Sequence, residues 1–193
     1  MSVQEIEITH FHLFAGLGGA AMGFNRGSAR VGNLVAKFRC IGGVDVDPAA
    51  MRDFKRLAGV EGTVLDLFDR EQYIAFHGHE PPAGWVEATP QDIQRAAGYE
   101  RPAAVVCCAP CKGFSGLLSE EKSKTAKYQA LNRLTLRGIW LMLEAWSDDP
   151  PELVVFENVP RLATRGRALL DRITALLRSY GYATAESVHD CGE

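Results

Sequence analysis

Short apolar runs alternate with segments of helical periodicity along most of this chain, and that alternation is what most constrains the fold. The apolar runs are residues 6–14, 37–47, 62–68, 103–109 and 152–159. Helical spacing separates or follows them at residues 15–27, 48–59, 130–146 and 167–181. The last two runs contain unbroken apolar stretches, as in strands buried on both faces. The pattern therefore predicts an α/β fold with a doubly wound, mostly parallel sheet.

The length favours a single domain. At 193 residues the chain is long enough for one substantial core and too short for two ordinary domains. We therefore interpret residues 1–193 as one domain. Residues 69–102 are polar, rich in Pro and Gly, and longer than a usual strand-to-helix connection, so we expect them to be an insertion.

Composition excludes several classes of protein. No apolar stretch approaches the roughly 20 residues that cross a bilayer. The N-terminus lacks the basic start and apolar core of a secretory signal, so we expect a cytoplasmic protein with reduced cysteines and no membrane partner. The formal net charge of −3 gives no general attraction to nucleic acid, which argues against a complete DNA-binding protein.

The stretch FAGLGG follows the first apolar run and opens a helix. Its residues Gly16, Gly18 and Gly19 allow a tight turn and a close approach of backbone to a ligand at the helix N-terminus. A tight turn that binds nothing explains the same glycines equally well. The loop also lacks the third glycine of G-x-G-x-x-G and the Lys-Ser/Thr of a P-loop. A nucleoside cofactor without a pyrophosphate, such as S-adenosylmethionine (SAM), therefore fits better than a dinucleotide.

Carboxylates end the next two apolar runs. Asp45 lies more than 20 residues after the glycine loop, where an acidic side chain can accept both ribose hydroxyls of a nucleoside. Asp47 precedes Pro48 and could instead cap the following helix. Asp66 ends the third run, so it is expected at the same carboxyl edge of the sheet, where ligands of open α/β folds bind.

The stretch CCAPCKGFSG, residues 107–116, holds three of the five cysteines. A nucleophilic cysteine has to be exposed, with its thiolate favoured by a nearby cation or a helix N-terminus. Cys111 meets this description because it follows a Pro, precedes Lys112, and is followed by small residues that leave backbone N–H groups accessible. Cys107 and Cys108 belong to the apolar run, where we expect small buried side chains.

Two other interpretations of the cysteines stay open. Cys108 and Cys111 match the C-x-x-C pattern of a redox dithiol, although that motif is expected after an early strand. A zinc site would have to combine His77 and His79 with two cysteines at no recognised spacing. The sequence therefore predicts no metal site.

Glu157, in the stretch FENVP, directly follows the last apolar run. A carboxyl group at the end of a buried strand can be partly desolvated, which raises its pKa and lets it donate a proton near neutral pH. Capping of the next helix, or pairing with Arg161, would explain Glu157 without catalysis. A thiolate and a proton donor that face a SAM site are the groups needed to activate an electron-poor ring.

The stretches FAGLGG, VDVDP, DL, APCKGFS and FENVP resemble, in this order, the successive motifs of DNA (cytosine-5)-methyltransferases. The resemblance covers nearly the whole chain and implies a Rossmann-like SAM-dependent methyltransferase fold that acts on double-stranded DNA. It implies that Cys111 attacks C6 of a cytosine flipped out of the duplex, while Glu157 holds and protonates N3. C5 then takes the methyl group of SAM, a base removes the C5 proton, and elimination frees the cysteine.

The resemblance also implies roles for residues around the cofactor and the DNA. Phe14 would stack on the adenine, Asp45 would bind the ribose, and Asp66 the adenine amine. Ser115 would contact the DNA backbone, and Asn158 would orient the Pro-Cys loop on the substrate side. The full implied cofactor set is Phe14, Ala15, Gly16, Leu17, Gly18, Gly19, Asp45, Val46, Asp66, Leu67, Pro110 and Leu136.

Three departures from the family pattern limit the expected function. His12 stands where the family usually has Asp, and Lys112 replaces a common Gln. The sequence also ends before the family's Gln-Arg-x-Arg segment, target-recognition region and returning C-terminal helix, so we expect a domain that is incomplete at the C-terminus. The sequence could be an excerpt of a longer chain, or one member of a split enzyme whose second polypeptide carries the missing motifs. The resemblance also implies a restriction-modification role. A SAM-binding partner without catalysis, and a SAM-dependent methyltransferase for another substrate, are the alternatives.

Overall fold

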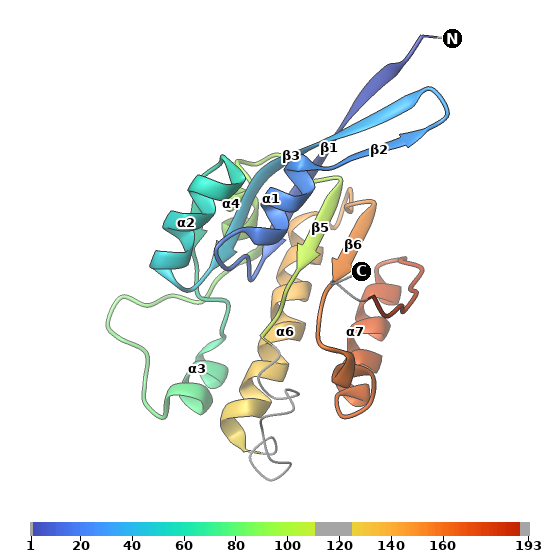
Figure 1. Ribbon diagram of the computed structural model, residues 1–193. Coiled ribbons are helices and arrows are strands. Elements are labelled where there is room, and N and C mark those ends of the chain that lie inside the picture. Colours follow the sequence, from blue (N-terminus) through green and yellow to red (C-terminus); the bar gives the residue numbers. More distant parts are fainter. Residues whose placement is uncertain (1, 111–124, 190–193) are drawn as a thin grey trace.

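A computed structural model describes residues 2–110 and 125–189 (Figure 1). Its sheet contains β1 (Gln4–Leu13), β2 (Ser28–Val31), β3 (Leu34–Asp45), β4 (Gly62–Val64), β5 (Ala104–Cys107) and β6 (Leu153–Phe156). The strand order is β2-β3-β1-β5-β6, and β4 pairs with β3. All pairs are parallel except β2 with β3. The expected α/β fold with a mostly parallel sheet is confirmed.

The chain reverses its direction of travel across the sheet between β1 and β5. From β1 it moves outward to β3 and β4, and then returns to the other side of β1 to form β5 and β6. The carboxyl ends of β1 and β5 therefore flank a topological switch point, which is where open α/β sheets bind ligands. Both the glycine loop and the Pro-Cys segment start at this point.

Helices cover both faces of the sheet (Figure 1). Helices α1 (Gly19–Arg26) and α2 (Pro48–Ala58) pack on one face, whereas α4 (Pro90–Ala96) contacts β3 from the other face and packs against α6 (Ala126–Ala145). Helix α3 (Arg70–His77) also packs on α6, and α7 (Arg167–Ser179) lies against α6 and the short helix η1 (Pro160–Ala163). None of the helices in the described ranges is long and apolar enough to cross a membrane.

Successive residues of β1 point to opposite faces and so divide the core in two. Phe11 and Leu13 belong to the larger core, which also includes buried residues of α6 and α7. His10 and His12 point to the other face, where their rings contact Phe24 of α1 and, for His12, Phe54 of α2. Both histidines are buried.

The ends of α2 follow the signals in its sequence. The Asp47 carboxylate accepts a hydrogen bond of 2.8 Å from the backbone N–H of Ala49, Pro48 occupies the first turn, and Gly59 ends the helix in the left-handed region with φ 76°. The interpretation of Asp47 as a helix cap is therefore confirmed. Asp45 is not the cap of this helix.

Residues 69–102 contain two helices, α3 and α4, which the polar composition of this stretch obscures. Each helix begins with a capping box, Asp69 with Gln72 and Thr89 with Asp92, and both boxes are readable as Asp-x-x-Gln and Thr-x-x-Asp in the sequence. Ile93 of α4 is fully buried. The stretch thus supplies the helical crossover between β4 and β5.

The hairpin between β2 and β3 was also missed by the apolar periodicity. Gly32 and Asn33 separate the two strands, and a two-residue Gly-Asn connection is a hairpin signal. Gly32 has φ 60°, which such a turn requires. With the start of β1, the hairpin projects beyond the helices (Figure 1).

Candidate cofactor and active site

The glycine loop after β1 is held by hydrogen bonds to the end of β3. The backbone N–H of Ala15 donates to the Val44 carbonyl at 3.0 Å, and the N–H of Gly16 donates to Asp45 Oδ2 at 2.9 Å. Gly18 is the N-cap of α1 with φ 94°, and a Cβ there would lie 3.0 Å from the Phe54 ring. Glycine is therefore required at this position both by the backbone conformation and by the close approach of α2.

The Asp45 carboxylate joins the glycine loop to the start of α2. Its Oδ1 accepts from the backbone N–H of Asp47 at 3.1 Å, while Oδ2 bonds Gly16. Each oxygen keeps one lone pair for another donor. The carboxylate is half-buried, and the adjacent side chains of Val46 and Leu17 are 62% and 54% exposed. A polar group of fixed orientation thus stands beside exposed apolar side chains, which is the surface a nucleoside needs.

Asp66 follows β4 and is held in a similar way. Its Oδ1 accepts from the backbone N–H of Phe68 at 3.0 Å, and its Oδ2 accepts from the Trp85 indole at 3.2 Å. Trp85 comes from the 69–102 stretch, so that stretch contributes a positioning contact to the site. Sequence patterns offer no signal for Trp85, because its partner is set by tertiary packing.

The Phe14 ring lies against α6 at Gly138. Phe14 has φ 54°, and a Cβ at Gly138 would be 2.7 Å from its Cζ. The same Cβ would be 3.5 Å from Leu67 Cδ1, so Phe14, Leu67 and Gly138 meet at one place. Leu67 is buried and Phe14 is half-buried, which leaves part of the Phe14 ring for contact with a ligand. Gly138 is a site residue that sequence reasoning missed.

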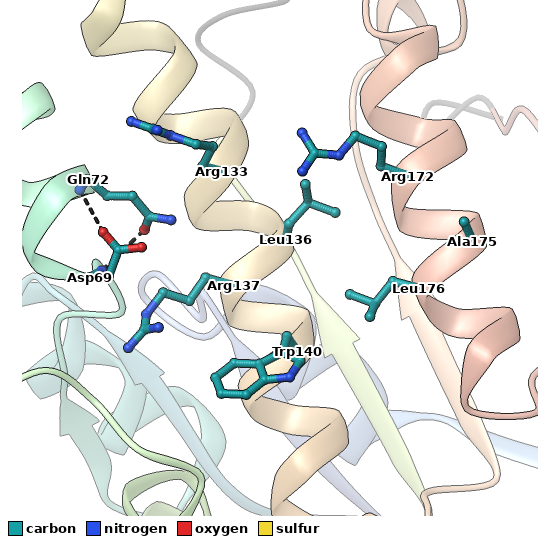
Figure 2. Close-up of a pocket in the computed structure, with 9 residues that line it drawn as sticks. All are labelled: Asp69, Gln72, Arg133, Leu136, Arg137, Trp140, Arg172, Ala175 and Leu176. Carbon is teal, nitrogen blue, oxygen red and sulfur yellow. Dashed lines mark hydrogen bonds between the residues drawn. The ribbon is translucent and has the colours of Figure 1, made fainter.

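Leu136 lies apart from this group. It is two residues from Gly138 on α6, and residues at that spacing point to opposite sides of a helix. Its side chain lines a depression of about 530 Å³ between α3, α6 and α7 (Figure 2). The other lining residues are Asp69, Gln72, Arg133, Arg137, Trp140, Arg172, Ala175 and Leu176. The structure therefore does not bring Leu136 together with the glycine loop.

The second part of the candidate site lies at the ends of β5 and β6. The backbone N–H of Glu157 donates to the Cys107 carbonyl at 3.0 Å, which sets Glu157 beside the start of the Pro-Cys segment. Its side chain is exposed, contrary to the desolvation expected from the sequence. Among the described residues, no side chain donates a hydrogen bond to its carboxylate, so pairing with Arg161 is not found.

Asn158 ties β6 to the Pro-Cys segment. Its amide Nδ2 donates to the Ala109 carbonyl at 3.3 Å, and its Oδ1 accepts from the backbone N–H of Val159 at 2.9 Å. Ala109 immediately precedes the half-buried Pro110. Cys111 and Ser115 lie outside the described residues. The contact from Asn158 reaches Ala109, two residues before Cys111 in the sequence.

Cys107, the last residue of β5, and Cys108, which directly follows it, are unsuited to nucleophilic attack. Cys107 is fully buried, and burial raises the pKa of its thiol. Cys108 is half-buried rather than buried, and its pKa is raised first by burial and then by the negative charge of Glu157. Both thiols are therefore held in the protonated, unreactive form.

Comparison with solved structures identifies the fold. The methyltransferase EhMeth of Entamoeba histolytica matches 90% of this chain with a TM-score of 0.55, at 14% sequence identity. The chain has a methyltransferase fold. The Dnmt2 methyltransferase of S. pombe matches 89% of the chain, with a TM-score of 0.48 and 12% identity.

Both solved structures are described as methyltransferases. The chain covers 44% of EhMeth and 41% of the S. pombe structure, so it spans less than half the length of the solved structures it matches. No protein-family model and no curated protein matches the sequence. The likeness establishes the methyltransferase fold, and the residues of the site carry the functional argument.

Replacing Gly138 by Ala tests the contact between α6 and Phe14. Alanine favours a helix over glycine by about 1 kcal/mol, but its Cβ would displace the Phe14 ring. We expect the free energy of unfolding to fall by about 1 kcal/mol or more in chemical denaturation. Gly23→Ala in α1 is the matched control, because nothing lies within 4 Å of a Cβ there, and it should raise the free energy of unfolding. Equal stabilisation by both substitutions would contradict the described contact.

Proposed function

We propose that this chain forms the SAM-binding and catalytic part of a methyltransferase that acts on C5 of cytosine in DNA. The observation that carries the proposal is the glycine loop, locked to Asp45 through Gly16 at the switch point of a methyltransferase fold. The Pro-Cys segment follows β5, and Glu157 follows the neighbouring strand β6. This arrangement supports a proposal in which the cofactor and the cysteine share one edge of the sheet.

The residues at this edge fit SAM. Asp45 has a free lone pair on each oxygen for the ribose hydroxyls, and Asp66 likewise for the adenine amine. Phe14 and Val46 supply apolar surface for the adenine, and the backbone from Ala15 to Gly19 lies where the methionine part would run. Bound SAM supplies an electrophilic methyl group.

The chain's own residues would prepare the base for that group. The Cys111 thiolate forms a bond to C6 of the cytosine, and Glu157 donates a proton to N3, so that electron density moves to C5. Asn158 acts on the Pro-Cys segment through the Ala109 carbonyl and so positions Cys111. Loss of the C5 proton and elimination of the thiolate return the enzyme to its starting state.

DNA recognition requires groups beyond those described. Specific binding needs groove contacts and several phosphate contacts, and a chain with a formal net charge of −3 offers no general attraction to phosphates. We propose that double-stranded DNA is the substrate and that recognition comes from further protein, either more of the same polypeptide or a second one.

The reaction is tested with the complete protein, methyl-labelled SAM, and duplex DNA or RNA as acceptor. We expect label in DNA, recovered as 5-methylcytosine. Labelled RNA with unlabelled DNA would keep the chemistry and reject the substrate. Label at the exocyclic amine of cytosine, or in neither acceptor, would reject the proposed function.

Asn158→Asp tests how the Pro-Cys segment is positioned. The substitution keeps the shape of the side chain but sets an oxygen against the Ala109 carbonyl, which costs about 1–3 kcal/mol. We expect the turnover number for methyl transfer to fall by about tenfold or more, while SAM affinity measured by calorimetry stays unchanged. A parallel loss of SAM affinity would show that Asn158 supports the whole site rather than this segment.

A further inference from the structure

Two histidines and a cysteine that the methyltransferase reaction does not use lie together in the smaller core. His10 and His12 are on β1, and Cys40 is the residue of β3 that pairs with His10. The side chains are 0%, 2% and 6% exposed, respectively. Their ligand atoms all lie within 4.8 Å of one another. This is the group of residues that we call the His-His-Cys cluster.

Asn25 of α1 determines which ring nitrogen of His10 carries a proton. Its Oδ1 accepts from the backbone N–H of Cys40 at 2.9 Å, and its Nδ2 donates to the Ala58 carbonyl at 2.8 Å, so its amide has one orientation. The same Oδ1 lies 3.0 Å from His10 Nε2, which must therefore carry a proton. His10 Nδ1 is then the acceptor in its 2.8 Å contact with His12 Nε2. For neutral rings, these contacts define both tautomers.

We propose that the His-His-Cys cluster binds a d-block metal ion that prefers nitrogen and sulfur ligands, Zn²⁺ or Cu⁺. The ligands would be His10 Nδ1, His12 Nε2 and Cys40 Sγ. Two imidazoles and a thiolate are the donor set that these ions select over the oxygen ligands of Mg²⁺ or Ca²⁺. Sequence reasoning could not find the site, because Cys40 joins the histidines only through the register of β3 with β1.

The three ligand atoms have to shift by roughly an ångström to hold a metal ion. In a tetrahedral site with metal–nitrogen bonds of about 2.0–2.1 Å, two ligand nitrogens are roughly 3.3 Å apart. The His10 and His12 nitrogens are now 2.8 Å apart, so they have to separate by about half an ångström. The Cys40 sulfur lies within 4.8 Å of the nitrogens and has to approach them to roughly 3.6 Å.

The surroundings match what metal-binding histidines need. A histidine ligand almost always donates its other ring N–H to an oxygen, and His10 already donates to Asn25 Oδ1. The Phe24 and Phe54 rings pack on the histidines and form an apolar shell. Asn25 is therefore a positioning residue for the site, held by its two backbone contacts.

Binding has a defined proton balance. Without an ion the Cys40 thiol keeps its proton and donates to the Gly42 carbonyl, 3.6 Å away. The ion displaces that proton to solvent as the metal–sulfur bond forms. His12 moves its proton from Nε2 to Nδ1, which frees Nε2 for the ion. One proton is thus released for each ion bound.

Titration with Co²⁺ as a spectroscopic probe tests the proposal. We expect a thiolate-to-cobalt absorption band that reaches its maximum at one ion per chain, and that is absent in Cys40→Ser. Cys108→Ser is the matched control and should keep the band. Zn²⁺ and Cu⁺ are then added separately, and the ion that removes the band at the lower concentration is the preferred one. No band, or a band lost in Cys108→Ser and kept in Cys40→Ser, would overturn the proposal.

A second measurement uses the unaltered chain. Cys40→Ser replaces a buried side chain, and if this variant did not fold, the cobalt titration would lack its comparison. Long-range ¹H–¹⁵N spectra report which imidazole nitrogens carry protons. Without an ion, His10 and His12 should both be protonated at Nε2, and saturating Zn²⁺ should move the His12 proton to Nδ1. Unchanged tautomers in the presence of Zn²⁺ would show that the cluster is only a buried hydrogen-bonded pair.

Discussion

Replacing Cys111 by Ser is expected to lower methyl transfer by about a thousandfold or more in the complete protein. A serine hydroxyl has a far higher pKa than a thiol, and it forms a nucleophile only beside a dedicated base. The sequence shows no such base next to position 111, where Lys112 is a cation. The rate is measured as labelled methyl groups transferred to DNA at saturating SAM.

Cys108→Ser is the control for that substitution. Burial and the nearby Glu157 raise the pKa of the Cys108 thiol, so this substitution should alter packing while most of the activity remains. DNA that contains 5-fluorocytosine should trap the covalent intermediate, because fluorine at C5 blocks elimination. A trapped peptide that carries the adduct on Cys108 would refute the assignment of Cys111.

The strands and caps were the most predictable parts of the fold. Unbroken apolar stretches located β5 and β6, and Asp47, Pro48 and Gly59 bounded α2 as expected. These features depend on neighbours in the sequence. The hairpin at Gly32 was missed because β2 is short and exposed on all of its residues, so it has no apolar run to detect.

The helices α3 and α4 were missed for a different reason. Both helices are short, at eight and seven residues, and the polar stretch around them hides the apolar residues that pack in the core, such as Tyr73, Phe76 and Ile93. A search for capping boxes in residues 69–102 would have found both helix starts. The prediction that this stretch is an insertion rested on its composition and length alone.

The candidate site residues that directly follow strands were predictable. Asp45, Asp66 and Glu157 each follow a strand, and in a parallel sheet these ends share one edge. Trp85 and Gly138 depend instead on contacts between distant segments, to Asp66 and Phe14 respectively. Such contacts are set by the packing of helices on the sheet, and a single sequence does not report them.

His12 departs from the family pattern, and only the structure shows what its side chain contacts. From the sequence it weakens the expected cofactor site, because a carboxylate is missing. In the structure its ring is buried against Phe54 and bonded to His10, on the face of β1 opposite to Phe11 and Leu13. The residue belongs to the smaller core beneath the glycine loop.

The central claim is that SAM binds at the glycine loop and Asp45, and calorimetric titration of this chain with SAM tests it most directly. Asp45→Ala should weaken SAM binding by about 1–3 kcal/mol, because the carboxylate would make charged hydrogen bonds to the ribose. That loss corresponds to an affinity about 5- to 150-fold lower. Asp47→Ala removes the neighbouring carboxylate, which caps α2, and should leave the affinity unchanged. Equal SAM affinity for the parent and Asp45→Ala, or no SAM binding by the parent, would contradict the account.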